Sequence, residues 1–314
     1  MEKINKTLKI FCITYNLHGL IPTEKEVSDL FDNYKNYDLY VIGTQECLRS
    51  ILKSLFISDK QIWEDLLQNY FKQYNLIQLK AVTLGPLHLI IFIKEELIKD
   101  KTNIRFIGCN SIKTGFYGFI ANKGANYIWF QLFNIKFLFI NCHLSAFKNQ
   151  HSVRIQHYNK IINNINITNG NQIFNTLNIF KGLDVINKFD VCVFLGDFNS
   201  RSEISLEDSK KLSYDKSINS QVLHLDQWNN SIKNGEINMD NFKENTIEFE
   251  PTYKVENVSG CKYKNDTEDH IPSYTDRIFY NIKLENYKCD NYKSLSEVSF
   301  SDHKPVILSI TLNI

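Results

Sequence analysis

The sequence predicts a single α/β domain over residues 1–314 of the chain. Three observations favour this fold class. Apolar runs of β-type residues recur from one end of the chain to the other, and segments of helical character lie between some of them. Core-like runs stand near both termini, so both ends are expected to close one core. Hydrophobic residues make up 43% of the chain, which is enough for a substantial core.

The expected elements alternate along the chain. The run at 191–196, VCVFLG, carries no charge and suits a central strand buried on both faces. The segments 58–74 and 149–165 have the character of helices, and the asparagine-rich stretch 161–178 is expected to be a helix end followed by a surface loop. The other expected strands cover residues 8–15, 37–43, 87–93, 127–133, 135–141 and 305–312.

Charge and cysteine content exclude several classes of protein. The formal net charge of +1 draws no nucleic acid to the surface, so an anionic substrate must be bound by a local cluster. The seven cysteines are odd in number and form no Cys-x-x-Cys pair, so we expect neither a disulfide framework nor a zinc site. This indicates a reducing compartment and a cytoplasmic protein. We find no signal-peptide pattern and no run of about 18 apolar residues that could span a membrane.

Polar side chains recur where the expected strands end or begin. Asp197 and Asn199 follow the run at 191–196, and on an extended backbone residues two apart project to the same face. A lone Asp-x-Asn is more often a turn. Glutamate, glutamine and histidine are not favoured turn residues, so the recurrence at other strands indicates a catalytic cleft. The other positions of this kind are Asn16, Gln45, Glu46, His143, Asp276, Arg277, Asp302 and His303.

These residue types suit the hydrolysis of a phosphate ester. The chain has neither a Gly-x-Ser-x-Gly motif nor a Walker loop, so acyl transfer and nucleotide binding are poorly supported. Hard oxygen ligands with few charges fit Mg²⁺, which keeps several waters and shares a substrate phosphate. Histidines beside acids fit attack by water, with the metal withdrawing charge from the phosphoryl oxygens and a carboxylate or amide aiming the water.

The motifs around these positions resemble a known family. The blocks TYNLHG, TQE, NKGA, NCHLSA, GDFNSR, EPTYK, PSYTDRI and SDHKPV resemble, in this order, the motifs of the inositol polyphosphate 5-phosphatases. That family belongs to the broader deoxyribonuclease-I-like fold, and the likeness runs from about Lys9 to Val306. It implies that the domain is a four-layer α/β/β/α sandwich of two mixed β-sheets flanked by helices.

The resemblance assigns the metal and the attacking water. Glu46, with Asn16 nearby, is expected to hold Mg²⁺. Asp197 is expected to orient and deprotonate the water, with Asn199 beside it. By itself, Asn16 would more readily be read as a residue that caps a turn, and it is the ordered set of motifs that favours the site.

The resemblance also assigns the groups around the scissile phosphate. His143 and His303 are expected to donate hydrogen bonds to it. Asp276 is expected to fix the orientation of His303, because a carboxylate behind an imidazole holds its tautomer and stabilises the imidazolium. Asp302 is expected to support the metal and water network.

The implied substrates are phosphoinositides such as phosphatidylinositol 4,5-bisphosphate, or soluble inositol polyphosphates such as inositol 1,4,5-trisphosphate. Tyr253 and Lys254 are expected to bind the neighbouring ring phosphate, and Asn122 and Lys123 the phosphate on the lipid side. Arg277 is expected to buttress the cleft or to contact phosphate.

One stretch departs from the family pattern. Where many members carry Lys-x-Arg-x-Pro, this chain has Glu268 and His270, and Tyr274 stands in place of the usual tryptophan. A reversed charge at a phosphate contact costs on the order of 1–3 kcal/mol if that contact is made. Lys262 and Lys264 are candidates to compensate.

Three aromatic residues, Phe116, Tyr117 and Phe119, precede the Asn-Lys pair and are expected to contact the membrane interface, which would make the protein peripheral at the cytosolic face of membranes. The alternative is that they are core residues.

We expect a monomer, because the cleft needs no second chain. Two other functions stay open at this point: a nuclease-type or sphingomyelinase-type phosphodiesterase of the same fold, and a catalytically inactive phosphoinositide-binding module.

Overall fold

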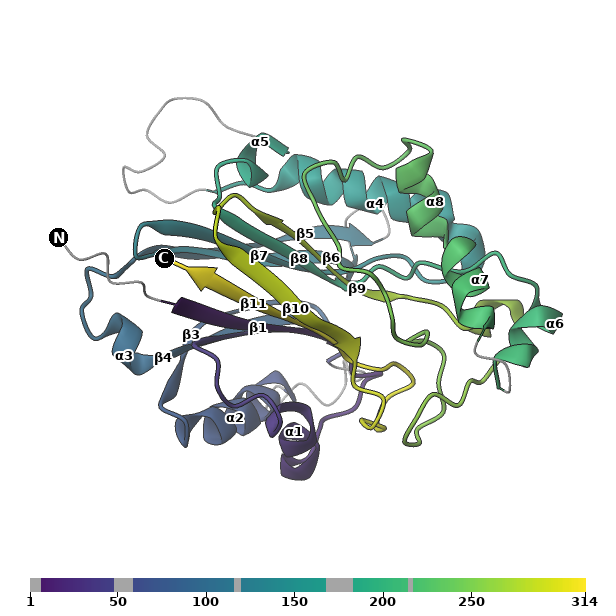
Figure 1. Ribbon diagram of the computed structural model, residues 1–314, viewed down its shortest axis with the longest axis horizontal. Helices are drawn as coiled ribbons and strands as arrows, with labels where there is room; N and C mark the ends of the chain where they lie inside the picture. Colours follow the sequence, from purple (N-terminus) through teal and green to yellow (C-terminus); the bar gives the residue numbers. More distant parts are fainter. Residues whose placement is uncertain (1–6, 48–58, 116–119, 168–182, 214–216) are drawn as a thin grey trace.

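Two β-sheets lie face to face, and helices cover the outer face of each, so the chain forms four layers (Figure 1). The computed structural model describes residues 7–47, 59–115, 120–167, 183–213 and 217–314. This architecture confirms the predicted α/β/β/α sandwich of two mixed sheets.

The first sheet has six strands and contains both ends of the described chain. Its first strand pairs antiparallel with the last, from Thr7 opposite Asn313 to Thr14 opposite Val306, which confirms that both ends close one core. The strand order is β10-β11-β1-β2-β4-β3. The bounds are β1 Thr7–Asn16, β2 Leu39–Gln45, β3 Leu76–Leu84, β4 Leu87–Lys94, β10 Tyr287–Ser294 and β11 Val306–Asn313.

The second sheet has five strands in the order β5-β6-β7-β8-β9. Two neighbours, β7 and β8, are parallel, and the other pairs are antiparallel. A parallel pair needs a long crossover connection, and helical segments lie between β7 and β8 in the chain. The bounds are β5 Ile104–Gly115, β6 Ile120–Leu132, β7 Ile135–His143, β8 Val191–Asp197 and β9 Asp276–Ile282.

The helices lie outside the sheets (Figure 1). α1 begins after Thr23, whose hydroxyl accepts from the Glu26 amide while the Glu26 carboxylate accepts from the Thr23 amide, a capping box. The α-helices are α1 Glu24–Phe31, α2 Asp59–Lys72, α3 Glu95–Ile98, α4 His151–Asn164, α5 Leu183–Ile186, α6 Leu206–Ser209, α7 Ile218–His224 and α8 Gln227–Lys233. Short 3-10 turns cover Lys148–Gln150, Lys210–Ser213 and Glu268–His270. Within the described segments, no helix combines the length and the apolar character needed to cross a membrane.

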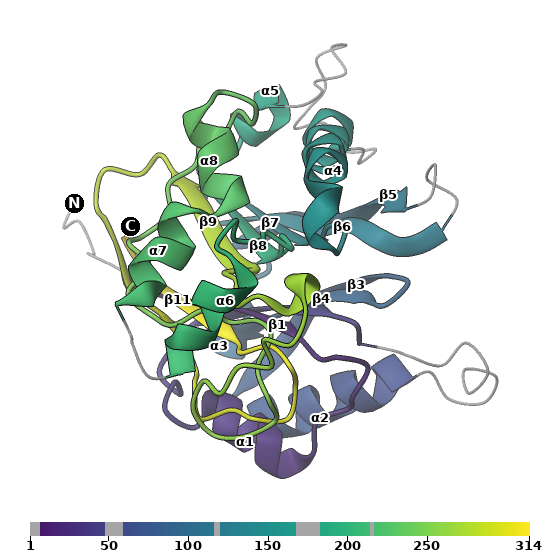
Figure 2. The ribbon, with the colours of Figure 1, turned by 90° about the vertical axis from the view of Figure 1, so that its right-hand side faces the viewer.

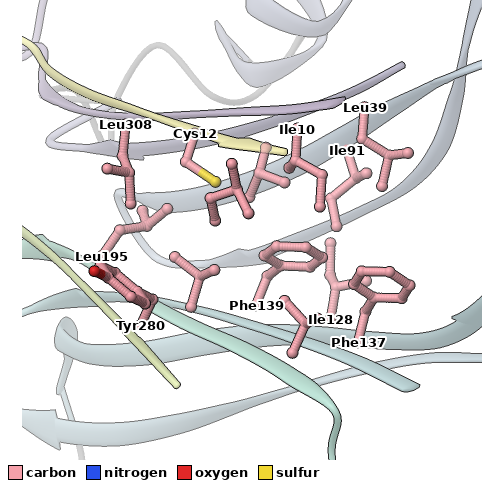
Figure 3. Packing of buried hydrophobic residues seen from close by; sticks show 14 of the residues in the cluster. Ile10, Cys12, Leu39, Ile91, Ile128, Phe137, Phe139, Leu195, Tyr280 and Leu308 are labelled. Atoms are coloured by element: carbon pink, nitrogen blue, oxygen red, sulfur yellow. The ribbon is translucent and has the colours of Figure 1, made fainter. Parts of the chain in front are cut away.

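The main core fills the space between the sheets. Alternate residues of each strand point into it, among them Ile10, Ile91, Phe139 and Leu195, and Figure 3 shows these side chains meeting from the two sides. The intervening residues of the strands face the helices and form two further clusters, one under α4 and one under α1 and α2. Each central strand is therefore buried on both faces, as the uncharged run at 191–196 predicts.

All of the expected strands and both expected helices are present, with shifted ends. No apolar run predicts β3, β5, β9 or β10, and the sequence places β9 only as the strand that follows Asp276 and Arg277. These four are the edge strands of the two sheets. β3, β5 and β10 mix buried with half-buried or exposed positions, so none of these three contains a continuous apolar run. α4 ends at Asn164, and residues 168–178 of the asparagine-rich stretch lie outside the described segments.

Candidate active site

The candidate site lies at one end of the layer between the sheets, where the apolar stripes become polar. β1 runs parallel to β2, and β7 runs parallel to β8, so these strands finish at that end in Asn16, Gln45, His143 and Asp197. β9 and β11 are antiparallel to β8 and β1 and start there, at or just after Asp276 and His303. Figure 2 views the molecule from the side on which the loops between these strands gather.

Asp197 is the centre of the cluster. Its Oδ2 accepts from Asn16 Nδ2 at 3.0 Å and lies 3.3 Å from His143 Nε2. Burial opposes a charge on Asp197, but the two imidazoles of His143 and His303 and the Lys123 ammonium outweigh it, so the pKa of Asp197 lies below its ordinary value. The side chain is therefore a permanent carboxylate, held by residues of both sheets.

Asn199 reaches this cluster by a route that the sequence argument did not predict. β8 ends at Asp197, and Asn199 has a positive φ of 51°, so the two residues do not share one face of an extended strand. Instead, the Asn199 amide donates to Asp197 Oδ1 at 2.8 Å, which is an Asx turn. The Asn199 side chain donates to Leu144 O at 3.1 Å and accepts from Arg201 Nη2 at 2.8 Å. Asn199 therefore fixes Asp197 through its main chain.

The predicted contact between Asp276 and His303 is present. His303 Nδ1 lies 2.9 Å from Asp276 Oδ2, and the hydroxyls of Thr252 and Thr275 donate to the same oxygen at 2.7 and 2.8 Å. Burial acts to lower the pKa of His303, but the Asp276 carboxylate outweighs it and raises the pKa to about 9. His303 is therefore an imidazolium at neutral pH, as stabilisation of a phosphoryl group requires.

The oxygen ligands for a metal ion are best supplied by Glu46 and Asp197. Asn16 Nδ2 faces both carboxylates, 3.5 Å from Glu46 Oε1 and 3.0 Å from Asp197 Oδ2, while its Oδ1 accepts from the His18 amide at 3.0 Å. Because the backbone donor fixes the amide, Asn16 presents nitrogen to the site and orients the carboxylates rather than ligating. Two carboxylates near one partly exposed position fit a hard divalent cation.

A second group of candidate metal ligands is less suitable. Ligand atoms of Asp197, Asp276 and His303 lie within 4.8 Å of one another. Asp276 Oδ2 already accepts from Thr252, Thr275 and His303. The raised pKa of His303 keeps its ring protonated, and a protonated imidazole cannot bind a metal. We therefore read Asp276 and His303 as a charge-stabilising pair beside Glu46 and Asp197, the two carboxylates that would hold a cation.

His143 faces three charged groups. Its Nε2 contacts the Lys123 ammonium, lies 3.3 Å from Asp197 Oδ2 and 4.0 Å from Glu46 Oε1. Burial, together with the Lys123 charge, lowers the pKa of His143. Burial likewise lowers the pKa of Lys123 to about 8. The two histidines thus differ, one neutral and one charged at neutral pH, because Asp276 lies on the far side of His303, whereas no described residue pairs with His143 Nδ1.

Lys254 and Tyr253 lie next to the same cluster. Lys254 Nζ is 3.2 Å from Asp302 Oδ2, and the other oxygen of Asp302 is 3.1 Å from His18 Nδ1. The Tyr253 ring packs against the His303 ring with centroids 4.6 Å apart. Asp302 therefore links Lys254, which is predicted to bind the ring phosphate, with His18. The His18 ring also lies 4.0 Å from Glu46.

Arg201 is a site residue that the sequence argument missed, although it ends the quoted block GDFNSR. Its guanidinium stacks on Tyr253 at 4.2 Å from the ring centroid, donates to Asn199 Oδ1 and donates to Asp269 O at 3.3 Å. Its position beneath Tyr253 connects the ring-phosphate residues with Asn199. Thr252 and Thr275 were missed in the same way, inside the quoted blocks EPTYK and PSYTDRI.

The predicted phosphate contact of Arg277 is wrong. The side chain has no exposed surface, and its guanidinium is taken up by Glu244, Asp226 and Asn229. A guanidinium with these partners cannot reach a substrate. Of the two predicted roles, only the structural one agrees with its position.

The stretch that departs from the family pattern lies beside this network. Glu268 pairs with Lys148 at 3.0 Å, and His270 pairs with Asp266. Lys262 pairs with Glu256 on the surface at 2.6 Å, with 68% of its side chain exposed, so it is not aimed at the cluster. Tyr274 is a buried core residue whose hydroxyl donates to Phe249 O at 3.0 Å.

Asn122 is a predicted position that contributes nothing to this geometry. Asn122 is exposed, at the start of β6, and no side-chain contact connects it to the cluster. The proposed membrane contact of Phe116, Tyr117 and Phe119 falls outside the described residues.

The raised pKa of His303 predicts a pH-dependent stability. A folded-state pKa of about 9 against an ordinary 6.5 contributes stability that is complete below pH 6.5 and is lost as the pH rises through 9. The contribution is on the order of 3 kcal/mol. We expect the free energy of unfolding, measured with denaturant in EDTA at pH 6.5 and 9.5, to fall by more in the natural chain than in His303→Asn.

The control for that comparison is His224→Asn, which removes an exposed histidine at the end of α7. It should keep the pH dependence of the natural chain. Equal losses of stability in the natural chain and His303→Asn would show that the His303 imidazolium contributes no such term.

A family model described as endonuclease/exonuclease/phosphatase family 2 matches residues 13–309. Polyphosphatidylinositol phosphatase INP53 of Saccharomyces cerevisiae is 30% identical over 276 residues, which cover 86% of this chain and 23% of that protein. Inositol polyphosphate 5-phosphatase K of Mus musculus is 27% identical over 325 residues, which cover 95% of this chain and 64% of that protein. The chain thus spans less than two thirds of the length of these curated relatives.

One solved structure shares both fold and sequence with the chain. It is the inositol polyphosphate 5-phosphatase domain of SPsynaptojanin, in complex with inositol (1,4)-bisphosphate and calcium ion. The TM-score is 0.79 and the sequence identity 28%, and the match covers 99% of this chain and 85% of that one.

Proposed function

Because this chain belongs to the endonuclease/exonuclease/phosphatase family, and because the relatives it resembles are named as 5-phosphatases, we propose that it removes the 5-phosphate from an inositol ring. The resemblance read from the motifs is confirmed by these comparisons. The proposed substrates are phosphoinositides such as phosphatidylinositol 4,5-bisphosphate and soluble inositol polyphosphates such as inositol 1,4,5-trisphosphate, and the proposed cofactor is Mg²⁺.

The observation that carries this proposal is that the buried site combines an ionised carboxylate, Asp197, with a protonated histidine, His303. Asp197 is an ionised carboxylate held in place by Asn16 and by the Asn199 amide, and it aims the attacking water. His303, charged by Asp276, donates to the phosphoryl group and stabilises the charge that develops on it. His143 binds the same phosphate from the opposite sheet.

Glu46 and Asp197 are the residues that would hold the cation, with Asn16 holding both carboxylates in place. When bound, Mg²⁺ withdraws charge from the phosphoryl oxygens. The calcium ion in the related domain supports a divalent cation at this fold's site, and the all-oxygen donors support Mg²⁺ as its identity.

The ring is oriented by cations beside the reacting centre. Lys254 is 3.2 Å from Asp302 and can exchange this partner for a ring phosphate, with Tyr253 and Arg201 stacked behind it. Glu268 neutralises Lys148, so that side of the cleft offers little attraction to a further phosphate. We therefore favour substrates whose phosphates meet Lys254 over those phosphorylated at additional positions.

The location of the activity is part of the same proposal. A cytoplasmic monomer that meets the cytosolic face of membranes through Phe116, Tyr117 and Phe119 would reach both a lipid head group and a soluble inositol phosphate. The balanced charge of the chain supports this assignment over a nuclease, because nucleic-acid affinity needs clustered cations.

Phosphate release with Mg²⁺ tests the function directly. We expect release from vesicles of phosphatidylinositol 4,5-bisphosphate, from inositol 1,4,5-trisphosphate, or from both, and we expect EDTA to abolish it. Comparison of the two substrates identifies the preferred form. Cleavage of a phosphodiester such as bis-p-nitrophenyl phosphate, with no release from either inositol substrate, would contradict the proposal in favour of a phosphodiesterase. Vesicle binding by folded protein without any release would contradict it in favour of an inactive binding module.

A further inference from the structure

Lys123, which is expected to bind the phosphate on the lipid side, contacts the buried cluster. Its ammonium contacts His143 Nε2, and that nitrogen is 3.3 Å from Asp197 Oδ2 and 4.0 Å from Glu46 Oε1. The ammonium therefore shares His143 Nε2 as a neighbour with both carboxylates that would hold the cation. The charges of Asp197 and Glu46 both act on Lys123.

This position depends on a backbone irregularity within β6. Ala125 faces the helix layer, so regular alternation would place Lys123 on that face too, whereas His143 shares the parity of Phe137 and Phe139, which face the other sheet. Gly124, paired with His143, has a φ of 147°, and a Cβ there would lie 2.0 Å from Ile112 O. The pairing with β5 shifts register beside it. A glycine is required here, and the altered backbone directs Lys123 to His143.

We propose that the Lys123 ammonium is the built-in counter-cation of the Glu46 and Asp197 carboxylates, and that it couples metal binding to phosphate binding. Before any ligand binds, Lys123 balances the carboxylates. A divalent cation at the same carboxylates repels it. When a phosphate enters, the ammonium binds its oxygens, and the repulsion is replaced by attraction to a shared anion.

The chemistry of His143 requires the same movement. An ammonium can only donate a hydrogen bond, so its contact requires an Nε2 that carries no proton, whereas donation from Nε2 to a phosphate requires one. To donate from Nε2 to a phosphate, His143 must lose this contact. Transfer of the ammonium to the phosphate releases Nε2 at the moment when a donor is needed.

The inference rests on the proposed metal-dependent function, and metal titration tests it without an activity assay. Free Mn²⁺ would be followed by electron paramagnetic resonance as it is added to the EDTA-treated protein, with and without inorganic phosphate. We expect Lys123→Met and Lys123→Gln to bind Mn²⁺ at least about fivefold more tightly than the natural chain when phosphate is absent, because a nearby like charge is removed. Phosphate should tighten Mn²⁺ binding in the natural chain and much less in these variants, since linked ligands affect each other equally.

Two controls test whether the change in Mn²⁺ affinity comes from the positive charge at position 123, rather than from the shape of the side chain or from the net charge of the protein. Lys123→Arg keeps the cation and should bind Mn²⁺ like the natural chain. Lys136→Met removes a lysine near the opposite end of β7 and should leave the Mn²⁺ affinity unchanged. Equal or weaker Mn²⁺ binding by both neutral variants would overturn the proposal and return Lys123 to the remote phosphate. Because this readout needs no turnover, failure of the phosphatase assay alone leaves the result interpretable.

Discussion

Asp197→Asn should lower the rate of phosphate release by about 10³-fold while leaving the fold intact, because the substitution keeps the shape and removes the carboxylate that aims the water. Asp197 is 1% exposed and receives hydrogen bonds from Asn16 and from the Asn199 amide. An amide in its place cannot accept on both sides and carries no negative charge to aim the water. The measurement is initial-rate phosphate release with Mg²⁺ on inositol 1,4,5-trisphosphate, with the thermal midpoint recorded alongside.

Asp190→Asn is the matched control for this variant. Asp190 lies just before the opposite end of β8, where its carboxylate accepts from the Lys136 amide at 2.8 Å. Its substitution should leave the rate within about twofold of the natural chain, since surface changes away from the site have small effects. A rate for Asp197→Asn close to that of the control would remove Asp197 from the catalytic group.

Arg277→Met should reduce the free energy of unfolding by about 3–5 kcal/mol, because removal of one member of a buried ion cluster leaves the others unpaired. Arg277 has no exposed surface, its Nη1 lies 3.3 Å from Asp226 Oδ1, and its Nε donates to Glu244 Oε1 at 2.5 Å. Methionine fills much of the same volume but leaves two carboxylates away from water. Denaturant unfolding at neutral pH measures the loss.

A second substitution tests the cause of that loss. Glu244→Gln combined with Arg277→Met removes one of the two unpaired buried carboxylates and should recover part of the free energy of unfolding. Lys35→Met, which breaks an exposed pair with Asp32, should leave the free energy of unfolding close to that of the natural chain, because solvent screens such a pair. If Arg277→Met were as stable as Lys35→Met but had a raised KM for substrate, the phosphate contact rejected above would be correct after all.

The strands that apolar runs predicted are the interior ones. Residues 191–196 and 135–141 are covered on both faces, so every position favours an apolar residue and the run is visible without any structure. The edge strands β3, β5 and β10 have one side of the ladder and parts of both faces near water. Their composition is mixed for that reason, and only pairing with a neighbour reveals them.

The site shows a similar division. Glu46, Asp197, His143 and His303 were recognisable because acids and imidazoles at the ends of apolar runs have no role in a core. Arg277 belongs to the same motif as Asp276, yet its side chain goes to the opposite face. Adjacent residues of a strand point to opposite sides, so sequence proximity could not decide which of the two meets the substrate.

The sequence by itself determined the class of fold, the interior strands and the residue types of a metal-dependent phosphoester site, because these follow from local patterns of polarity and from ordered motifs. Tertiary structure alone decided which atoms meet. The amide of Asn16 presents nitrogen because the His18 amide binds its oxygen. Two histidines differ in charge because Asp276 lies behind His303, whereas no described residue pairs with His143 Nδ1. Lys123 contacts the cluster because the backbone of β6 is irregular at Gly124. Each of these depends on contacts between segments far apart in the chain, and such contacts exist only once both sheets are packed.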